Sequence, residues 1–260
     1  MPAPRVEQPR NIGTTAAQHA HNGLVAARRA ADRLDEVVSG LSAATLPAAS
    51  RLPGWTRGHV LTHLARNADA LVNLLGWAKT GVEHPMYPSG ADRDADIAEG
   101  AHRLLQVQQE DLTASSDRFF GTAEALSDYA WEATLVSRSG RPMPASDVPW
   151  MRLTELLVHL VDLDLGLGFT DTVDLAGEQL PGVFDYVAWT YGERSDVPAL
   201  EVEVEVELSD GELARWPITT AEPGDEPALV RGPAPAMLSW LCGRDSDGLA
   251  GPLPVLPVWM

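Results

Sequence analysis

The residues with the clearest chemical potential are a glutamate and a histidine in an otherwise apolar segment. Glu155 and His159 are separated by Leu156, Leu157 and Val158. In a helix, residues four positions apart lie on the same face, one turn apart. Burying a carboxylate without a partner costs several kcal/mol. On this apolar face Glu155 therefore needs a cation as its partner. The pair therefore predicts either an ion pair or one side of a metal site.

A metal site needs a third ligand, and the best candidate is His63, from an earlier segment of the chain. Two histidines and one glutamate, with the remaining coordination position open to water or substrate, are typical of catalytic zinc. Asp162 lies seven residues after Glu155, on the same side of the helix. It could accept the second ring N–H of a ligand histidine, or it could lie on the surface. We predict that His63, Glu155 and His159 bind Zn²⁺ or another divalent metal.

Other arrangements of these residues stay open at this point. An ion pair between Glu155 and either Arg152 or Arg66 would neutralise the carboxylate without a metal. His59 lies four residues before His63, and its place near the helix start favours a structural or pocket role. The His-Glu-x-x-His run of zinc proteases is absent from the sequence.

Helical spacing of apolar residues predicts the elements that hold these side chains. The predicted helices cover about residues 14–38, 56–79, 92–120 and 146–166. Thr56 has the side chain of an N-cap residue, and Pro149 fits the first turn of the last helix. Four long helices with modest connections favour a four-helix bundle, in which metal sites are commonly built from facing helices.

The sequence changes character after residue 168. Apolar residues alternate with glutamate at every step over residues 200–208, which predicts a strand with one face in solvent. Asp210 and Gly211 indicate a hairpin turn, and Pro217 in the returning strand, residues 213–218, fits a sheet edge. The remaining predicted elements are a strand at residues 228–231 and helices at residues 184–192 and 235–241.

The length and the charge of the chain limit its class. The 260 residues fit two moderate domains, and we expect an α+β fold. The bundle would occupy residues 1–170 and a smaller α+β domain residues 171–260. The formal net charge, 19 − 37 = −18, would repel nucleic acids and anionic membranes, although a few arginines in a cleft could still bind an anionic substrate.

The sequence also bears on location. The first eleven residues contain three prolines and no apolar core, so we expect no secretory signal. No uncharged apolar run approaches the ~18–20 residues that span a bilayer. Cys242 is the only cysteine, which excludes an intramolecular disulfide and fits a cytoplasmic protein. We expect Cys242 to be a small buried hydrophobic residue.

Several motifs along the chain carry a family resemblance. They are the segment 54–63 (GWTRGHVLTH), Asn67–Ala68, Trp77–Ala78, Pro85–Met86–Tyr87, Arg141–Pro142–Met143–Pro144–Ala145, Trp150–Met151–Arg152 followed by Glu155, His159 and Asp162, and Gly243–Arg244 followed by Asp247–Gly248. In combination they resemble the mycothiol-dependent maleylpyruvate isomerases, which belong to the DinB-like metalloprotein superfamily. The resemblance covers nearly the whole chain.

This resemblance implies a fold, a set of ligands and a reaction. It implies a DinB-like four-helix bundle that binds Zn²⁺ through His63, Glu155 and His159, with the smaller α+β domain closing over it. It implies mycothiol, a low-molecular-weight thiol, as cofactor, and the conversion of maleylpyruvate to fumarylpyruvate in gentisate degradation. Arg93 and Arg244 resemble two arginines implicated in the family and would bind the dianionic substrate.

Elementary chemistry agrees with that implication. A cis double bond conjugated to a carbonyl group does not rotate, whereas addition of a thiolate turns it into a single bond. Rotation and expulsion of the thiolate then leave the trans isomer. Because the chain has no usable nucleophilic cysteine, the thiol must be external, and zinc would hold it as thiolate. Arginines suit the carboxylates of a dianion and would stabilise the enolate formed on addition.

Three other functions could use the same residues. A mycothiol S-transferase would add the thiol to a different electrophile and not expel it. A non-catalytic small-molecule binder would bind its ligand even after Glu155→Gln. Zinc-dependent hydrolysis is weaker, because no additional general base stands beside the three ligands. For any of them we expect a monomer or a small homo-oligomer.

Overall fold

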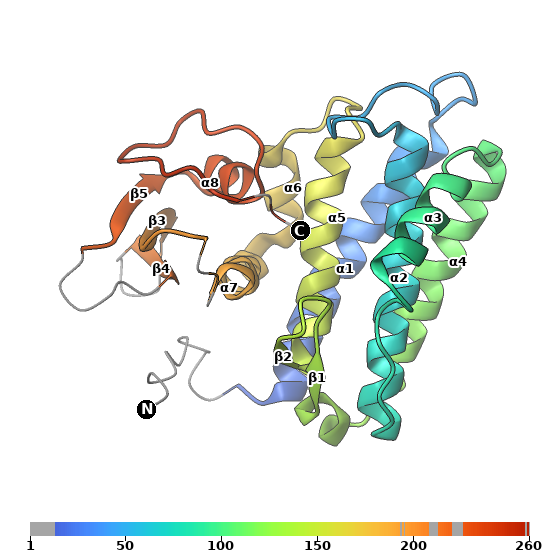
Figure 1. The fold of residues 1–260 in the computed structure, drawn as a ribbon, viewed down its shortest axis with the longest axis horizontal. Coiled ribbons are helices and arrows are strands. Elements are labelled where there is room, and N and C mark those ends of the chain that lie inside the picture. Colours follow the sequence, from blue (N-terminus) through green and yellow to red (C-terminus); the bar gives the residue numbers. More distant parts are fainter. Residues whose placement is uncertain are drawn as a thin grey trace.

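A computed structural model describes residues 14–192, 194, 196–207, 213–219, 226–257 and 259. Long helices stand side by side in one half of the molecule, and a small sheet with shorter helices forms the other half (Figure 1). This is the α+β arrangement that the sequence predicts.

The helical half is a four-helix bundle. Its members are α1 (Ala16–Ser39), α2 (Arg57–Thr80), α4 (Leu105–Glu124) and α5 (Val148–Asp162). Helix α2 packs against α4 and α5, and α1 packs against the same two helices from the other side. The N-cap prediction for α2 is confirmed, because Thr56 precedes its first turn with extended backbone angles.

Helix α5 is the central element of the molecule, and all of its residues are buried. It contacts α1 and α2 of the bundle and also α6 (Phe169–Ala176) and α7 (Leu180–Tyr191). A helix covered on every side must be apolar all round, which explains its leucine-rich sequence. It ends at Asp162, four residues before the predicted end, because Asp164 adopts a left-handed conformation with φ 54°.

The single helix predicted over residues 92–120 is wrong. The chain forms α3 (Gly90–Gly100) and then, after a short connection, α4. Gly100 lies so close to Thr62 of α2 that a Cβ atom there would approach its methyl group to 2.4 Å. Gln108 of α4 donates to the carbonyl oxygens of Gly100 and Ala101, at 3.1 Å each. Close packing and these side-chain bonds end α3 where apolar periodicity alone indicated continuation.

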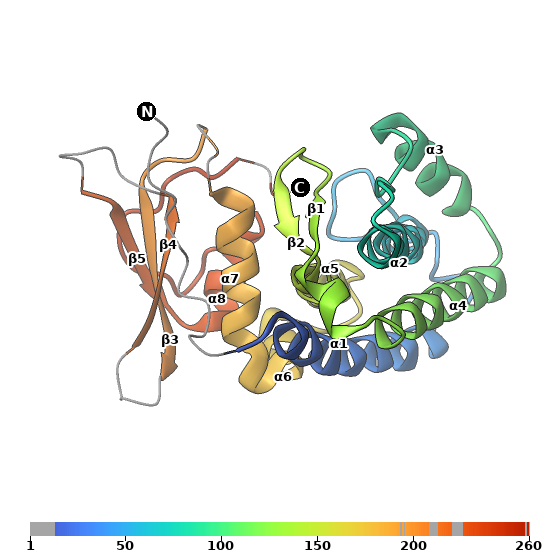
Figure 2. The same cartoon turned by 90° about the horizontal axis from the view of Figure 1, so that it is seen from below.

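A small hairpin joins α4 to α5. Two 3-10 turns, Asp128–Glu132 and Ala145–Asp147, flank strands β1 (Thr134–Val136) and β2 (Pro142–Pro144), which pair antiparallel. Gly140 has φ 81° in the connecting turn, a conformation that glycine adopts readily. The hairpin lies between α7 and α2 (Figure 2).

The second half contains a mixed sheet of β3 (Leu200–Glu207), β4 (Leu213–Thr219) and β5 (Ala228–Gly232). The order is β4-β3-β5, with β3 antiparallel to β4 and parallel to β5. Pro217 therefore lies on an edge strand, as predicted. Helices α7 and α8 (Ala234–Leu241) lie on the bundle side of this sheet (Figure 2). Helix α6 was not predicted, and α7 starts four residues earlier than expected.

One prediction about the sheet needs correction, because the glutamate face of β3 is not uniformly in solvent. Glu205 is exposed, but Glu203 is buried. Its carboxylate accepts hydrogen bonds from Arg215 of β4 (2.7 Å) and Arg231 of β5 (2.9 Å). Strict alternation places side chains on a face, and the arginines on the neighbouring strands decide what covers it.

Three further predictions concern the domain boundary, two short segments and membrane-spanning helices. The domain boundary between residues 170 and 171 falls inside α6 and stays a prediction. The first eleven residues and the Asp210–Gly211 turn lie outside the described residues. Among the helices that the structure describes, none combines the length and apolar character needed to cross a bilayer.

Candidate metal centre and its pocket

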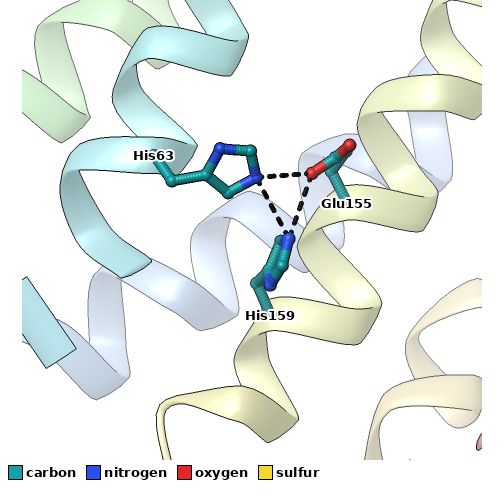
Figure 3. A group of neighbouring side chains, drawn as sticks. All are labelled: His63, Glu155 and His159. Carbon is teal, nitrogen blue, oxygen red and sulfur yellow. Dashed lines mark hydrogen bonds and ion pairs between the residues drawn. The ribbon is translucent and has the colours of Figure 1, made fainter. Parts of the chain in front are cut away.

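Three predicted ligands meet at the interface of two bundle helices. His63 projects from α2 toward Glu155 and His159 of α5 (Figure 3). The His63 Nε2 atom lies 2.9 Å from Glu155 Oε2 and 3.1 Å from His159 Nε2. The third side of the triangle, from His159 Nε2 to Glu155 Oε2, is 3.2 Å. All three residues are buried, with exposed fractions of 4%, 8% and 7%.

The triangle fits a small divalent cation. Ligand atoms placed about 2.0–2.1 Å from a tetrahedral Zn²⁺ are separated by roughly 3.3 Å, close to the separations found here. Three atoms with lone pairs face one another in a buried space, an arrangement that a bound cation stabilises. The described residues contain no second group of three histidine, cysteine or acidic side chains whose ligand atoms lie this close together. The donor set therefore suits zinc, although the geometry alone does not assign the metal.

Asp162 determines the orientation of one imidazole. Its Oδ2 atom lies 2.8 Å from His159 Nδ1, which donates to it. The proton on Nδ1 leaves the lone pair of a neutral His159 on Nε2, directed at the centre of the triangle. Burial lowers the pKa of His159, but the hydrogen bonds to Asp162 and Glu155 outweigh it and raise this pKa. A metal at this site would therefore displace a proton.

The other two ligands show opposite responses to burial. Desolvation lowers the pKa of His63 to about 4, which keeps its imidazole neutral near pH 7. Burial raises the pKa of Glu155, yet its interactions with His63 and His159 bring this pKa well below the ordinary value. The buried carboxylate is therefore ionised, and the neutral imidazole of His63 lies beside it.

The alternative ion pair with an arginine is not formed. Arg66 binds Asp69 and Asp111, at 3.0 and 2.7 Å. Arg152 donates to Leu64 O and to an asparagine side chain, and it forms no ion pair with Glu155. The partners of Glu155 within ion-pair distance are the two histidines.

His59 has a structural role at the start of α2. Its Nδ1 atom accepts a hydrogen bond from Thr56 N (3.2 Å) and lies 2.8 Å from Thr56 Oγ1, which closes the first turn of α2. Its ring stacks on Trp55 and faces His102. Only His63 of this i, i+4 pair points toward α5, so the two histidines of α2 have different tasks.

The two predicted arginines lie near the triangle, Arg93 beside His63 and Arg244 against Asp162. Arg93 NH2 is 3.4 Å from His63 Nδ1, and its NH1 binds Asp94 at 2.7 Å. Arg244 binds Asp162 through NH2 (2.5 Å) and Nε (3.2 Å). Arg244 therefore orients the aspartate that orients a ligand histidine, a role that its sequence motif did not indicate.

A cavity of about 900 Å³ opens over the triangle. Its walls come from α2, α5, the turn of the β1–β2 hairpin, α7, the segment after α8 and the C-terminal segment. Its described lining contains Arg51, Arg93, Arg138, Arg141, Arg194 and Arg244, whereas Glu155 is the only acidic residue there. Four of these arginines also bind aspartates, at 2.5 to 3.3 Å. The pocket lining is thus rich in guanidinium groups, in a chain whose net charge is −18, and such groups suit an anionic ligand.

Comparison with known proteins identifies the family. The family model described as "Mycothiol maleylpyruvate isomerase N-terminal domain" matches residues 27–164, just over half of the chain. The chain belongs to this family. It is thus a member of a family of enzymes, as the sequence motifs implied. No relative was found among curated proteins.

Solved structures extend the family similarity beyond the bundle. A crystal structure of a mycothiol-dependent maleylpyruvate isomerase is 29% identical, with a TM-score of 0.75. The match covers 92% of this chain and 97% of that chain. A histidine-to-alanine mutant of such an isomerase matches with 28% identity and the same coverage and TM-score. The sheet-containing half therefore belongs to the shared fold.

Within this isomerase-family pocket, several side chains were not predicted from the sequence. Arg138 and Arg141 come from the hairpin turn, and Arg194 follows α7. Arg141 stacks on Trp189, with its guanidinium carbon 4.6 Å from the ring centroid. Apolar periodicity contains no signal for such loop residues, because it reports which helix faces are buried and not where a turn folds back.

Other pocket residues have polar groups without partners. The Tyr186 hydroxyl and the Trp259 indole N–H form no hydrogen bond with any described residue. Cys242 also lines the pocket, and burial raises the pKa of its thiol. A buried, protonated thiol is a poor nucleophile, which agrees with the expectation that Cys242 acts as a hydrophobic residue.

Proposed function

We propose that this family member is a zinc- and mycothiol-dependent cis–trans isomerase that converts maleylpyruvate to fumarylpyruvate in gentisate degradation. The observation that carries the proposal is the buried triangle of two histidines and a glutamate beneath an arginine-lined cavity. We also propose a cytoplasmic location, which fits a chain whose sequence contains a single cysteine.

His63, Glu155 and His159 would hold the zinc ion in this proposal. When bound there, the ion would lower the pKa of a thiol that reaches its open position, so that the thiolate forms at neutral pH. Asp162 would keep His159 in the tautomer with a free Nε2 lone pair. Arg244 would hold Asp162 in place. The chain thereby fixes the ligands before any thiol or substrate enters.

An external thiol supplies the nucleophile whose reversible addition makes the double bond rotatable. The chain offers no substitute, because Cys242 is its only cysteine and burial raises the pKa of that thiol. The chain's own contribution would be to bind the dianion and to neutralise charge that develops on its carbonyl oxygen. Arg93, beside His63 at the pocket wall, is well placed for this task.

Arg244 would have two tasks in this scheme. Its guanidinium lines the pocket, yet Nε and NH2 already contact Asp162. A carboxylate of the substrate would therefore meet an arginine whose orientation is fixed in advance, which lowers the entropic cost of binding. Replacing Arg244 should weaken substrate binding first and zinc binding second.

The test is an isomerisation assay with purified, zinc-loaded protein. We expect conversion of maleylpyruvate to fumarylpyruvate with mycothiol, no conversion without it, and loss of activity after zinc removal by a chelator. Turnover that does not need the thiol would contradict the proposal. A stable thioether detected by mass spectrometry would instead indicate the alternative, a mycothiol S-transferase.

A further inference from the structure

Asn67 lines the pocket close to the candidate metal centre. It lies on α2 one helical turn after His63, so their Cβ atoms are about 5–6 Å apart. It is a lining residue of the cavity, and only 2% of its surface is exposed. A polar amide at this position is next to the candidate metal centre without being one of its ligands.

Arg152 of α5 fixes the orientation of this amide. Its NH1 atom donates to Asn67 Oδ1 at 3.0 Å and to Leu64 O at 2.8 Å. A guanidinium group has only donors, so the atom of Asn67 that faces it must be the oxygen. The amide nitrogen must point the other way.

The burial of the Arg152 side chain is energetically costly. It is 0% exposed, and its Nε and NH2 atoms have no hydrogen-bond partner among the described residues. Burying a charge with unsatisfied N–H groups is unfavourable, and an apolar residue would avoid that cost. Its two hydrogen bonds both go to α2, and the side-chain partner is Asn67. Arg152 is thus suited to hold the asparagine.

The Asn67 amide nitrogen is available to a ligand. No described residue accepts a hydrogen bond from Nδ2. Nδ2 is also not sealed from solvent, whereas the unpartnered Nε of Arg152 is. The Nδ2 atom therefore has access to the cavity and two N–H groups to donate there.

We propose that Asn67 donates a hydrogen bond through Nδ2 to an oxygen of the bound dianionic substrate, and that Arg152 is the positioning residue that aims it. This inference rests on the proposed isomerase function for the identity of the ligand. A donor held in place before the reaction stabilises negative charge on oxygen without reorganisation. Removing one such donor typically lowers the rate by about 10²–10³-fold.

Two substitutions of Asn67 test the donor. Asn67→Asp keeps the shape and the contact with Arg152 but presents a negative oxygen to the cavity. Asn67→Ala removes the amide altogether. We expect kcat/KM to fall by about 10²-fold or more in both, with the larger loss in Asn67→Asp because the carboxylate repels the dianion. Asn22→Asp, at a partly exposed position of α1, is the matched control for the charge change and should leave kcat/KM unchanged.

Two readouts separate a donor from a structural residue. Zinc content should stay at the wild-type level in both Asn67 variants, and affinity for maleate, a cis-dicarboxylate probe, should fall about tenfold, the loss of one hydrogen bond to a charged group. If zinc is lost in parallel with activity, or if kcat/KM stays within about twofold of wild type, the inference is wrong. An inactive wild type would refute the proposed isomerase function, and maleate affinity would then decide the role of Asn67: a loss supports it, equal affinity overturns it.

Arg152 needs its own test, because it acts through Asn67. Arg152→Met should lower kcat/KM nearly as much as Asn67→Ala, and combining the two should add little, since they remove one interaction. Arg152→Lys keeps a donor toward Asn67 Oδ1 and should restore most of the activity. Losses that add in the double variant, or no rescue by lysine, would overturn the positioning role.

Discussion

Two buried carboxylates in this molecule show how the neutralising partner determines what a charged group can do. Glu155 of α5 and Glu203 of β3 are each only 8% exposed, although Glu155 lies in an apolar run of the sequence and Glu203 in a strand that alternates apolar residues with glutamate. Glu155 faces two histidines at 2.9 and 3.2 Å. Glu203 lies between Arg215 and Arg231 on the neighbouring strands. Burial is the same, but the chemistry differs.

The difference lies in whether the partners can give up their protons. Arginine stays protonated, so Glu203 is in a closed ion pair that crosslinks three strands. Histidine can become a neutral ligand, so the same carboxylate charge next to His63 and His159 can instead attract a metal ion. The arginine cluster is thus suited to stabilise the sheet, and the histidine cluster is suited to bind a cation.

The largest expected effect comes from removing the negative charge at each site. Glu155→Gln should abolish zinc binding and lower activity by more than ~10³-fold, because two neutral imidazoles and an amide bind Zn²⁺ poorly. Glu203→Gln is the matched control and should keep both zinc and activity. Metal content by mass spectrometry and the isomerase assay measure the two effects. Full zinc content in Glu155→Gln would break the comparison.

A smaller effect is expected from the residue that orients the metal ligand. Asp162→Asn removes the charged acceptor of the His159 Nδ1 proton and weakens the contact with Arg244. Loss of such an outer partner typically lowers metal affinity or activity by about 10–100-fold, because the imidazole is less basic and less fixed. Competition with a chromophoric chelator measures the change. Affinity equal to wild type would show that the triangle does not need Asp162.

The contrast between the two glutamates also shows how much could be predicted from sequence. Helical periodicity predicted the bounds of α1, α2 and α5 to within a few residues, and the alternating pattern predicted β3. The same methods joined α3 and α4, because the break depends on Gly100 packing against Thr62, a contact between distant segments. They also left Glu203 in solvent, because the arginines that cover it come from other strands.

The candidate site was predicted better than its surroundings. Spacing within one helix placed Glu155 and His159 together, and the donor set typical of catalytic zinc indicated His63 as the third ligand. The link from Arg244 to Asp162 and the link from Arg152 to Asn67 each join segments more than 80 residues apart. No local pattern contains that information. The candidate metal ligands could be proposed from the sequence, whereas the residues that orient them could be identified only from the fold.

The arginine-bound glutamate should influence stability in a pH-dependent way. Burial raises the pKa of Glu203, but the hydrogen bonds from Arg215 and Arg231 outweigh it and lower this pKa. The stabilisation is therefore complete above the ordinary glutamate pKa, about 4.3, and is lost as the pH falls through the lowered value. Glu203→Gln should melt at a somewhat lower temperature than wild type at pH 7, and the gap should close in acid. A gap independent of pH would mean that the ion pair is not its source.

The smallest expected effect concerns a third buried ionisable group, Cys242. It is 1% exposed, and burial raises the pKa of its thiol even with Arg244 nearby. Unlike the two glutamates it has no partner strong enough to stabilise its charged form, so it should stay protonated. Cys242→Ala should keep mycothiol-dependent activity within about twofold, and the native thiol should resist a thiol-specific reagent at pH 8 until the protein unfolds. Rapid labelling that abolishes activity would mean that an uncompensated buried group can ionise here, contrary to the rule that the glutamates illustrate.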